Sequence, residues 1–139
     1  MRLTSFISLF TALNRITSAI PIAEFDDATN DIIEKNVYSG KATYYSTGLG
    51  ACGVTSNDAE MVVALSHDLY DTQKASNNVA EYCGKKITLS WGGKNATVTV
   101  VDRGTFDGAT NLDLSPAAFQ VFASPDQGVL QDIQWKFIE

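Results

Sequence analysis

The sequence contains few of the residues from which metal centres and thiol-based active sites are built. Its 139 residues include one histidine, His67, and two cysteines. Zinc sites draw chiefly on these two residue types, so we predict neither a metal site nor a bound cofactor. Because His67 stands alone beside Asp68, we interpret it as a turn residue rather than as a catalytic base.

Basic residues are also scarce. The chain carries 10 lysines and arginines against 16 aspartates and glutamates, which gives a net charge of −6 at pH 7 and a pI near 4.6. An acidic protein is repelled by nucleic-acid phosphates, by anionic membranes and by acidic wall polymers. We therefore expect no nucleic-acid partner and no membrane partner, and a neutral polymer fits better.

The chain also lacks an apolar run of about 20 residues, which a transmembrane helix requires. Its most apolar segment, residues 3–13, follows Arg2 and precedes small residues at positions 17–19. This order is typical of a secretory signal peptide. We predict a signal peptide over residues 1–19 and a secreted, extracellular protein, with an amphipathic N-terminal helix as the alternative.

The rest of the chain divides by composition. Residues 20–36 are acidic and show no sustained period, which indicates a poorly ordered linker or short pro-segment. Residues 37–139 are enough for one compact domain and not for two. We expect a monomer.

The two cysteines, Cys52 and Cys83, form an even pair. In a small secreted domain such a pair indicates one disulfide. A metal pair or a catalytic thiol is the competing interpretation, but the glycine that follows each cysteine suits a tight turn. A second mark of secretion is the sequon that begins at Asn95, a candidate glycosylation site at a predicted hairpin tip after Gly92 and Gly93.

Apolar residues alternate over several short segments, as Ile87, Leu89 and Trp91 do, and turn residues separate these segments. The pattern predicts six strands, over residues 40–45, 61–65, 86–91, 96–102, 111–114 and 133–137. Helical structure is expected only at residues 116–123, after the N-cap Ser115, and in a turn at 66–70. The periodicity predicts a single all-β domain, either a small barrel or a sandwich.

Two aspartates lie where these elements end and begin. Asp102 closes a β-branched strand, and Asp113 stands between Leu112 and Leu114 at period two, so leucines buried in a core turn the acid the other way. Burial by the leucines and the like charge of Asp102 would raise the pKa of Asp113, whereas a nearby Arg103 would lower it. In the alternative interpretation, both acids are turn and capping residues.

The segment that holds both acids, VTVVDRGTFDGATNLDLSPAAF over residues 98–119, resembles the signature of double-psi β-barrels of the rare-lipoprotein-A and expansin type. Residues 40–53, 62–71 and 131–137 are similar to further segments of the same domains, in particular of small secreted fungal proteins of the loosenin type. The resemblance implies a six-stranded double-psi β-barrel over residues 37–139, with one or two short helices.

The resemblance also implies roles for single residues. In expansin-like proteins the acid that matches Asp113 is essential for wall loosening, and the acid that matches Asp102 supports it. Many expansins place an aromatic residue two positions after the first acid, where this chain has Gly104. The residues implied as polysaccharide contacts, including aromatic ones that can replace it, are Thr43, Tyr44, Tyr45, Thr47 and Phe106.

The function that follows from the resemblance is binding and loosening of cell-wall polysaccharide, of the chitin or cellulose type, without hydrolysis. Hydrolysis needs an acid and a base, and barwin-related endoglucanases with this barrel draw the base from the opening strand. This chain has Tyr44, Tyr45 and Ser46 there. A transglycosylase-like activity needs only one acid, Asp113, and is a third candidate.

The second candidate is a protease inhibitor or a barwin-like defence protein that acts on another protein through surface loops. Small single-barrel proteins of this kind include protease inhibitors, and they need neither aspartate. Under this hypothesis the working surface is residues 47–52 or residues 72–81, and Asp102 and Asp113 are structural.

Overall fold

The computed structural model describes residues 37–72 and 80–138, which lie in one compact unit. The predicted signal peptide over residues 1–19 and the predicted linker over 20–36 lie outside the described residues, as does most of the loop between Thr72 and Glu81. Among the described residues, no helix has the length and apolar character needed to cross a membrane.

Within residues 37–72 and 80–138, all six predicted strands are present, together with two short α-helices and one 3-10 turn. The elements are β1 (Tyr38–Tyr44), β2 (Val62–Ser66), α2 (His67–Tyr70), β3 (Lys86–Trp91), β4 (Lys94–Gly104), β5 (Leu112–Leu114), α3 (Pro116–Phe122), η1 (Pro125–Gln127) and β6 (Leu130–Ile138).

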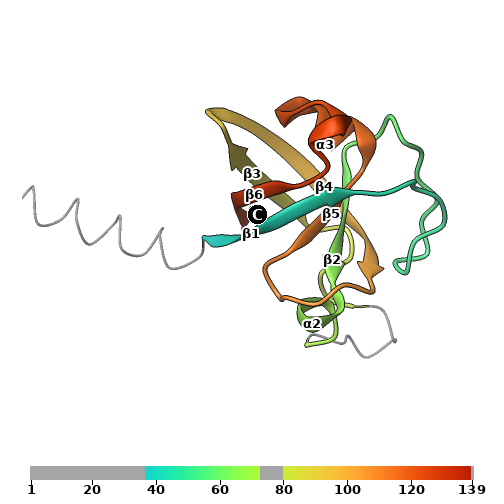
Figure 1. The fold of residues 1–139 in the computed structure, drawn as a ribbon. Coiled ribbons are helices and arrows are strands. Elements are labelled where there is room, and N and C mark those ends of the chain that lie inside the picture. The colour runs from blue at the N-terminus through green and yellow to red at the C-terminus, as the bar shows by residue number, and fades with distance from the viewer. Residues whose placement is uncertain (1–36, 73–79, 139) are drawn as a thin grey trace, which may run out of the picture. The chain divides into compact units, whose positions relative to one another are not determined.

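The strands close into a barrel in the order β1-β5-β2-β4-β3-β6. β1 pairs with β5 and β2 pairs with β4 in parallel, whereas the other neighbours are antiparallel. Figure 1 shows the strands crossing one another, with α2 and α3 at opposite ends of the barrel. The prediction of a six-stranded barrel with one or two short helices in a single domain is therefore confirmed, and a sandwich is excluded.

Inward-facing side chains fill the barrel, and α3 covers one end of it. Trp135 of β6 and Phe119 of α3 are fully buried. The helix begins where the sequence predicts, because the Ser115 hydroxyl accepts a hydrogen bond from the Ala118 amide and Pro116 occupies the first turn. Buried Phe119 and Phe122 then hold α3 against the core and fix the direction in which β5 leads into it.

The hairpin between β3 and β4 is tighter than predicted. Gly92–Gly93 has φ angles of 58° and 79°, the left-handed conformation that two-residue hairpin turns require. The ladder therefore continues to the Trp91–Lys94 and Ser90–Asn95 pairs, and β4 begins two residues before the predicted residue 96. Asn95 consequently lies in β4 and not at the hairpin tip, and its glycosylation stays a prediction.

The last strand begins three residues before the predicted residue 133. Asp132 has a φ of 58°, and this irregularity breaks the alternation, so that Leu130 and Ile133 are both fully buried. The register of the β1–β6 ladder also shifts between Gly40 and Ala42. The alternation of buried and exposed residues ends at such an irregularity, although the hydrogen-bonded ladder continues across it. For this reason the sequence pattern predicts a shorter strand.

Candidate functional site

The two aspartates predicted as site residues face the same residue of the strand between them. Ala64 of β2 is in register with Asp102 of β4 on one side and with Asp113 of β5 on the other. Neighbouring strands lie about 4.8 Å apart, so the two aspartate Cα atoms are roughly 10 Å apart. Their side chains project from the same face, and we call this arrangement the two-aspartate site.

An irregularity in β4 brings Asp102 into this position. Val63 pairs with Val100, but the next residue of β2, Ala64, pairs with Asp102, so Val101 is an extra residue in β4. Such a bulge turns the side chains that follow it to the other face. Without it, Val101 would lie opposite Ala64 and Asp102 would point away from Asp113.

Asp113 is half-buried between Leu112 and Leu114, which are 1% and 0% exposed. Its Oδ1 accepts a hydrogen bond of 3.0 Å from the Thr43 hydroxyl, directly opposite on β1. Burial raises the pKa of Asp113, the bond from Thr43 opposes this rise, and the nearby charge of Asp102 adds to it. The direction is the one expected from the sequence, and it favours a carboxyl group that can donate a proton.

Arg103 does not lower the pKa of Asp113, because its guanidinium is bound elsewhere. Its Nε and Nη2 donate to the two carboxylate oxygens of Asp71 at 2.8 and 2.6 Å. The Arg103 and Asp71 side chains are 37% and 40% exposed. The arginine thus connects β4 to the end of α2 and leaves the two-aspartate site acidic.

Asp102 has a different environment from Asp113, because main-chain donors occupy one of its oxygens. Its Oδ1 accepts hydrogen bonds of 2.8 Å from the amides of Ala51 and Arg103. Ala51 belongs to the loop between β1 and β2, which approaches β4 closely at Gly50, where a Cβ atom would collide with the Val101 carbonyl. Asp102 therefore anchors this loop as well as facing Asp113.

Tyr45 follows the end of β1 and is half-buried near both aspartates. Burial, then the charges of Asp102, Asp113 and Asp58, raise the pKa of Tyr45 to about 12. The phenol therefore stays protonated and can act as a hydrogen-bond donor beside these carboxylates. Of the predicted polysaccharide contacts, Thr43 on β1 and Tyr45 just after it join the two-aspartate site.

Asp58 is a third carboxylate near Tyr45 that the sequence analysis did not single out. Its Oδ1 accepts hydrogen bonds of 2.8 Å from both the amide and the hydroxyl of Thr47, and these bonds lower the pKa of Asp58. The predicted contact Thr47 is thus bound to Asp58 and not to Asp113. Asp58 lies in an irregular loop, where no periodic pattern marks a functional side chain.

Two of the aromatic candidates pack against other parts of the barrel. The Tyr44 ring lies 4.8 Å from that of Phe119, and its hydroxyl donates to the Pro125 carbonyl, so this side chain belongs to the end covered by α3. The Phe106 ring occupies the space that a side chain at Gly104 would take. Gly104 therefore leaves the room that the Phe106 ring needs two residues after Asp102.

The loop between β1 and β2 carries the most exposed large apolar side chains that the structure describes. Leu49 is 75% exposed and Val54 is 51% exposed. Cys52 lies between Leu49 and Val54 in sequence and forms the disulfide with Cys83 that the sequence analysis predicted. Neither Leu49 nor Val54 belongs to the buried core.

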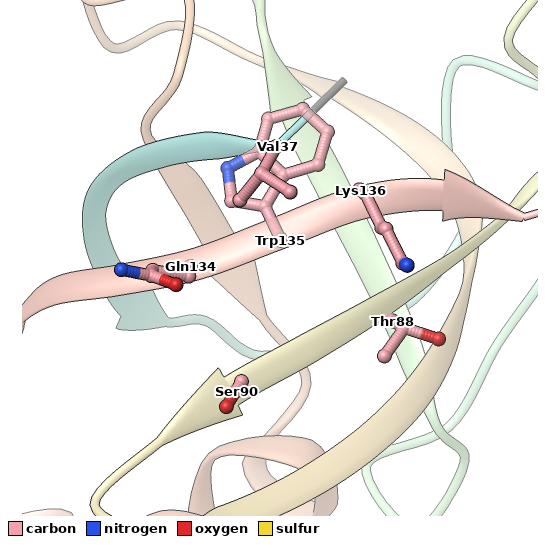
Figure 2. Close-up of a pocket in the computed structure, with 6 residues that line it drawn as sticks. All are labelled: Val37, Thr88, Ser90, Gln134, Trp135 and Lys136. Carbon is pink, nitrogen blue, oxygen red and sulfur yellow. The ribbon is translucent and has the colours of Figure 1, made fainter. Parts of the chain in front are cut away.

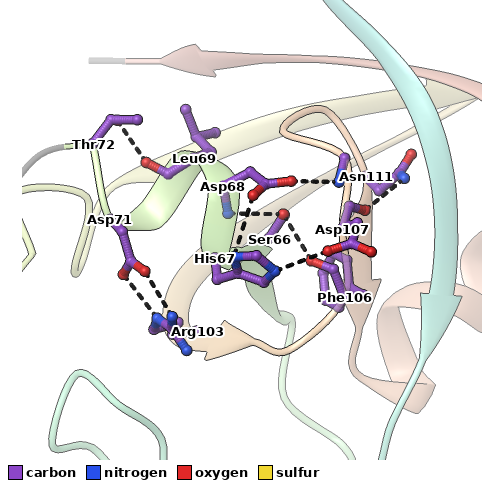
Figure 3. A network of polar contacts seen from close by, with 11 residues as sticks. Ser66, His67, Asp68, Leu69, Asp71, Thr72, Arg103, Phe106, Asp107 and Asn111 are labelled. Carbon is purple, nitrogen blue, oxygen red and sulfur yellow. Dashed lines mark hydrogen bonds and ion pairs between the residues drawn. The ribbon is translucent and has the colours of Figure 1, made fainter.

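A polar network connects α2 to the loop between β4 and β5, as Figure 3 shows. The imidazole nitrogens of His67 lie 3.2 Å from Asp68 and 3.1 Å from Asp107, and the second oxygen of Asp68 accepts a 2.7 Å bond from the Gly108 amide. The three side chains bring possible metal ligands within 4.8 Å of one another. Because each of the three side chains already has a partner within the protein, we interpret the network as a structural contact that holds α2 against the loop between β4 and β5.

A shallow pocket lies on β3 and β6, away from both aspartates (Figure 2). It has a volume of about 120 Å³ and contains no acidic side chain. Its residues are Val37, Thr88, Ser90, Gln134, Trp135 and Lys136. The Trp135 indole donates to the Thr110 carbonyl, so its polar atom is already used within the fold, and we assign no function to this pocket.

Comparisons with known proteins connect this barrel to two kinds of relative. The chain is 33% identical over 112 residues to a papain inhibitor of Streptomyces mobaraensis, covering 80% of this chain and 78% of the inhibitor. It is 33% identical to a homologue of allergen Asp f 7 from Arthroderma benhamiae, but spans only 38% of that protein.

Among solved structures, the Streptomyces papain inhibitor has a TM-score of 0.66 and 34% identity, over 74% of this chain and 94% of that chain. A mutant expansin of Clavibacter michiganensis in complex with cellohexaose has a TM-score of 0.62, over 74% of this chain and half of that one. Its 24% identity supports the fold alone.

A model of the family described as lytic transglycolase matches residues 37–135. The match covers nearly all of the described barrel, including both aspartates and both cysteines. The chain belongs to this family, the rare-lipoprotein-A-like double-psi β-barrels.

Proposed function

We propose that the two-aspartate site binds a neutral cell-wall polysaccharide, of the chitin or cellulose type, and loosens it without hydrolysis. The observation that carries this proposal is the register that sets Asp102 and Asp113 on either side of Ala64. With Thr43 and Tyr45 they present carboxylate, hydroxyl and phenol groups, the donors and acceptors that sugar hydroxyls need.

Hydrolysis would require a base as well as an acid, at a matched distance across the glycosidic bond. The environment of Asp113 favours its protonated form, which suits an acid. One oxygen of Asp102 is occupied by two main-chain amides, and one oxygen of Asp58 is occupied by Thr47. The environment of each of these two carboxylates suits a structural or binding role better than activation of water.

The test is sedimentation with insoluble cellulose and chitin, comparing the wild type with Asp113→Asn. A hydrogen bond to a charged group contributes about 1.5–3 kcal/mol, so we expect affinity to fall at least about tenfold. Asp132→Asn is the matched control, because it removes the same charge on β6 and asparagine tolerates the φ of 58° there. Equal binding by all three proteins would contradict the proposal.

The same preparations should release no reducing sugar from either polymer. Release of reducing sugar would show that the non-hydrolytic proposal is wrong. In that case, loss of the release in Asp58→Asn would identify Asp58 as the base. Release of soluble fragments from peptidoglycan that is lost in Asp113→Asn would instead favour the transglycosylase-like candidate, which needs one acid.

A second function, inhibition of a protease, is favoured by a separate observation. The papain inhibitor is matched over 78% of its length at 33% identity, whereas the expansin likeness rests on the fold. Inhibition of papain by the wild-type protein tests this candidate. Both proposed functions place the protein outside the cell, which is supported by the leader-like residues 1–19 and by the disulfide.

A further inference from the structure

The loop between β1 and β2 presents two apolar side chains that are each more than half exposed in the described structure. Four large apolar residues are exposed among the described residues, and two of them, Leu49 and Val54, lie within this one loop. They stand on the two sides of the Cys52 disulfide. We call residues 48–56 the apolar loop tip.

Hydrogen bonds within the apolar loop tip give it a defined shape. Leu49 forms an antiparallel bridge with Thr55, the Gly50 amide donates to the Val54 carbonyl at 3.0 Å, and the Ser56 amide donates to the Gly48 carbonyl at 2.9 Å. Leu49 and Val54 are thus held by the main chain of a small closed turn and not by a long mobile segment.

Contacts to β4 fix the apolar loop tip on the barrel. The Ala51 amide bonds Asp102, and the Cys52 amide donates to the Val101 carbonyl at 3.2 Å. The close approach at Gly50 and the disulfide to Cys83 complete the attachment. Such a loop loses little conformational entropy when it is bound, which is the main advantage of preorganised binding segments.

We propose that the apolar loop tip is the segment that enters the substrate cleft of a papain-like protease, with Leu49 and Val54 as its apolar anchors. The proposal rests on the second proposed function. The partner class follows from the likeness to the papain inhibitor, which covers most of both chains. Protease inhibitors dock with little backbone change, and buried anchor residues near the centre of an interface carry most of the binding energy.

The attachments also explain how the loop would withstand the protease. If the peptide bond after Leu49 were cut, β1 would still hold one side of the break. The Cys52 disulfide and the bonds to Val101 and Asp102 would hold the other. The new ends would stay in place, and the segment would remain in the cleft rather than leave as product.

The test is the inhibition constant for papain, measured with the wild type, Leu49→Asp, Val54→Asp and Val37→Asp. Papain is activated with a thiol and desalted before use, so that the Cys52–Cys83 bond stays intact. Loss of a central anchor typically costs 2 kcal/mol or more, so we expect Leu49→Asp and Val54→Asp each to raise the constant at least about 30-fold. Val37 is an exposed apolar residue on the β1 side of the pocket in Figure 2, and Val37→Asp should change the constant by less than about threefold.

The outcomes separate the loop proposal from the inhibitor function. Inhibition by the wild type that persists unchanged in both loop variants would overturn the loop proposal and keep the function. No inhibition by the wild type would overturn both. Because both substituted side chains are exposed, the thermal midpoints of the variants should match that of the wild type, and this measurement shows that any loss of inhibition is not a loss of fold.

Discussion

Removal of the disulfide is the perturbation whose effect can be worked most directly from the structure. Cys52 and Cys83 are 31 residues apart in sequence, and the bond restricts the unfolded chain by closing this loop. The chain-entropy relation gives about 3.7 kcal/mol at 25 °C for a loop of that length. We therefore expect the double variant Cys52→Ala and Cys83→Ala to lose about this much free energy of unfolding, a large part of the total for a domain of this size.

Urea unfolding followed by tryptophan fluorescence measures this loss. With an m-value of about 1.5 kcal/mol/M, the midpoint should fall by about 2.5 M. A decrease below about 0.7 M would refute the reasoning, because the segment between the cysteines would then not behave as a free loop in the unfolded chain. Thiol titration of the unfolded, unreduced wild type is the control, and it should detect no reactive group.

The same variant separates the two proposed functions. Without the bond to Cys83, the apolar loop tip keeps its contacts to Val101 and Asp102 but loses its covalent attachment. The ladder that sets Asp113 opposite Ala64 does not pass through the disulfide. We expect the inhibition of papain to weaken more than the binding of polysaccharide.

Two further predictions concern a charge and a close contact. Folding raises the pKa of Asp113 above its ordinary 3.8, so the wild type loses stability as the pH rises from 3.8 and Asp113 ionises. Asp113→Asn cannot ionise, and its stability relative to the wild type should therefore increase between pH 3 and pH 7. A relative decrease would contradict the burial argument. Gly50→Ala should lower the free energy of unfolding by about 1–3 kcal/mol, because its Cβ would collide with the Val101 carbonyl. Gly48→Ala lies in the same loop, and its Cβ would have no neighbour within 4 Å. It should therefore change the free energy of unfolding little in the same urea assay.

Local patterns were sufficient to predict that the six strands exist, although not where β4 and β6 begin, and to predict the environment of Asp113. Its two leucine neighbours alternate with it, so the burial of one face determines the direction of the other. The sequence Ser115–Pro116 marks the start of α3 because capping chemistry acts within a few residues. These inferences depend only on residues adjacent in sequence, and for this reason they agree with the structure.

The pairing of the two aspartates could not be predicted from periodicity, because it depends on residues far apart in the chain. Asp102 faces Asp113 only because Val101 is an extra residue opposite β2, and nothing in the β-branched run of β4 indicates which residue bulges. Similarly, Tyr44 and Tyr45 are adjacent, but Tyr44 packs on Phe119 and Tyr45 lies by the acids. The family resemblance supplied the pairing of the acids, and tertiary packing distinguishes the two tyrosines.

Asp102 connects the two proposed functions, because it belongs to the two-aspartate site and also holds the apolar loop tip through Ala51. A substitution at Asp102 would disturb both surfaces, so its effect cannot assign either function. Asp113 has no hydrogen bond to the loop in the described structure, and Leu49 lies outside the two-aspartate ladder. Asp113→Asn and Leu49→Asp are therefore the informative pair: each removes a group used by only one of the proposed surfaces, and opposite effects on polymer binding and on papain inhibition would show which surface is used.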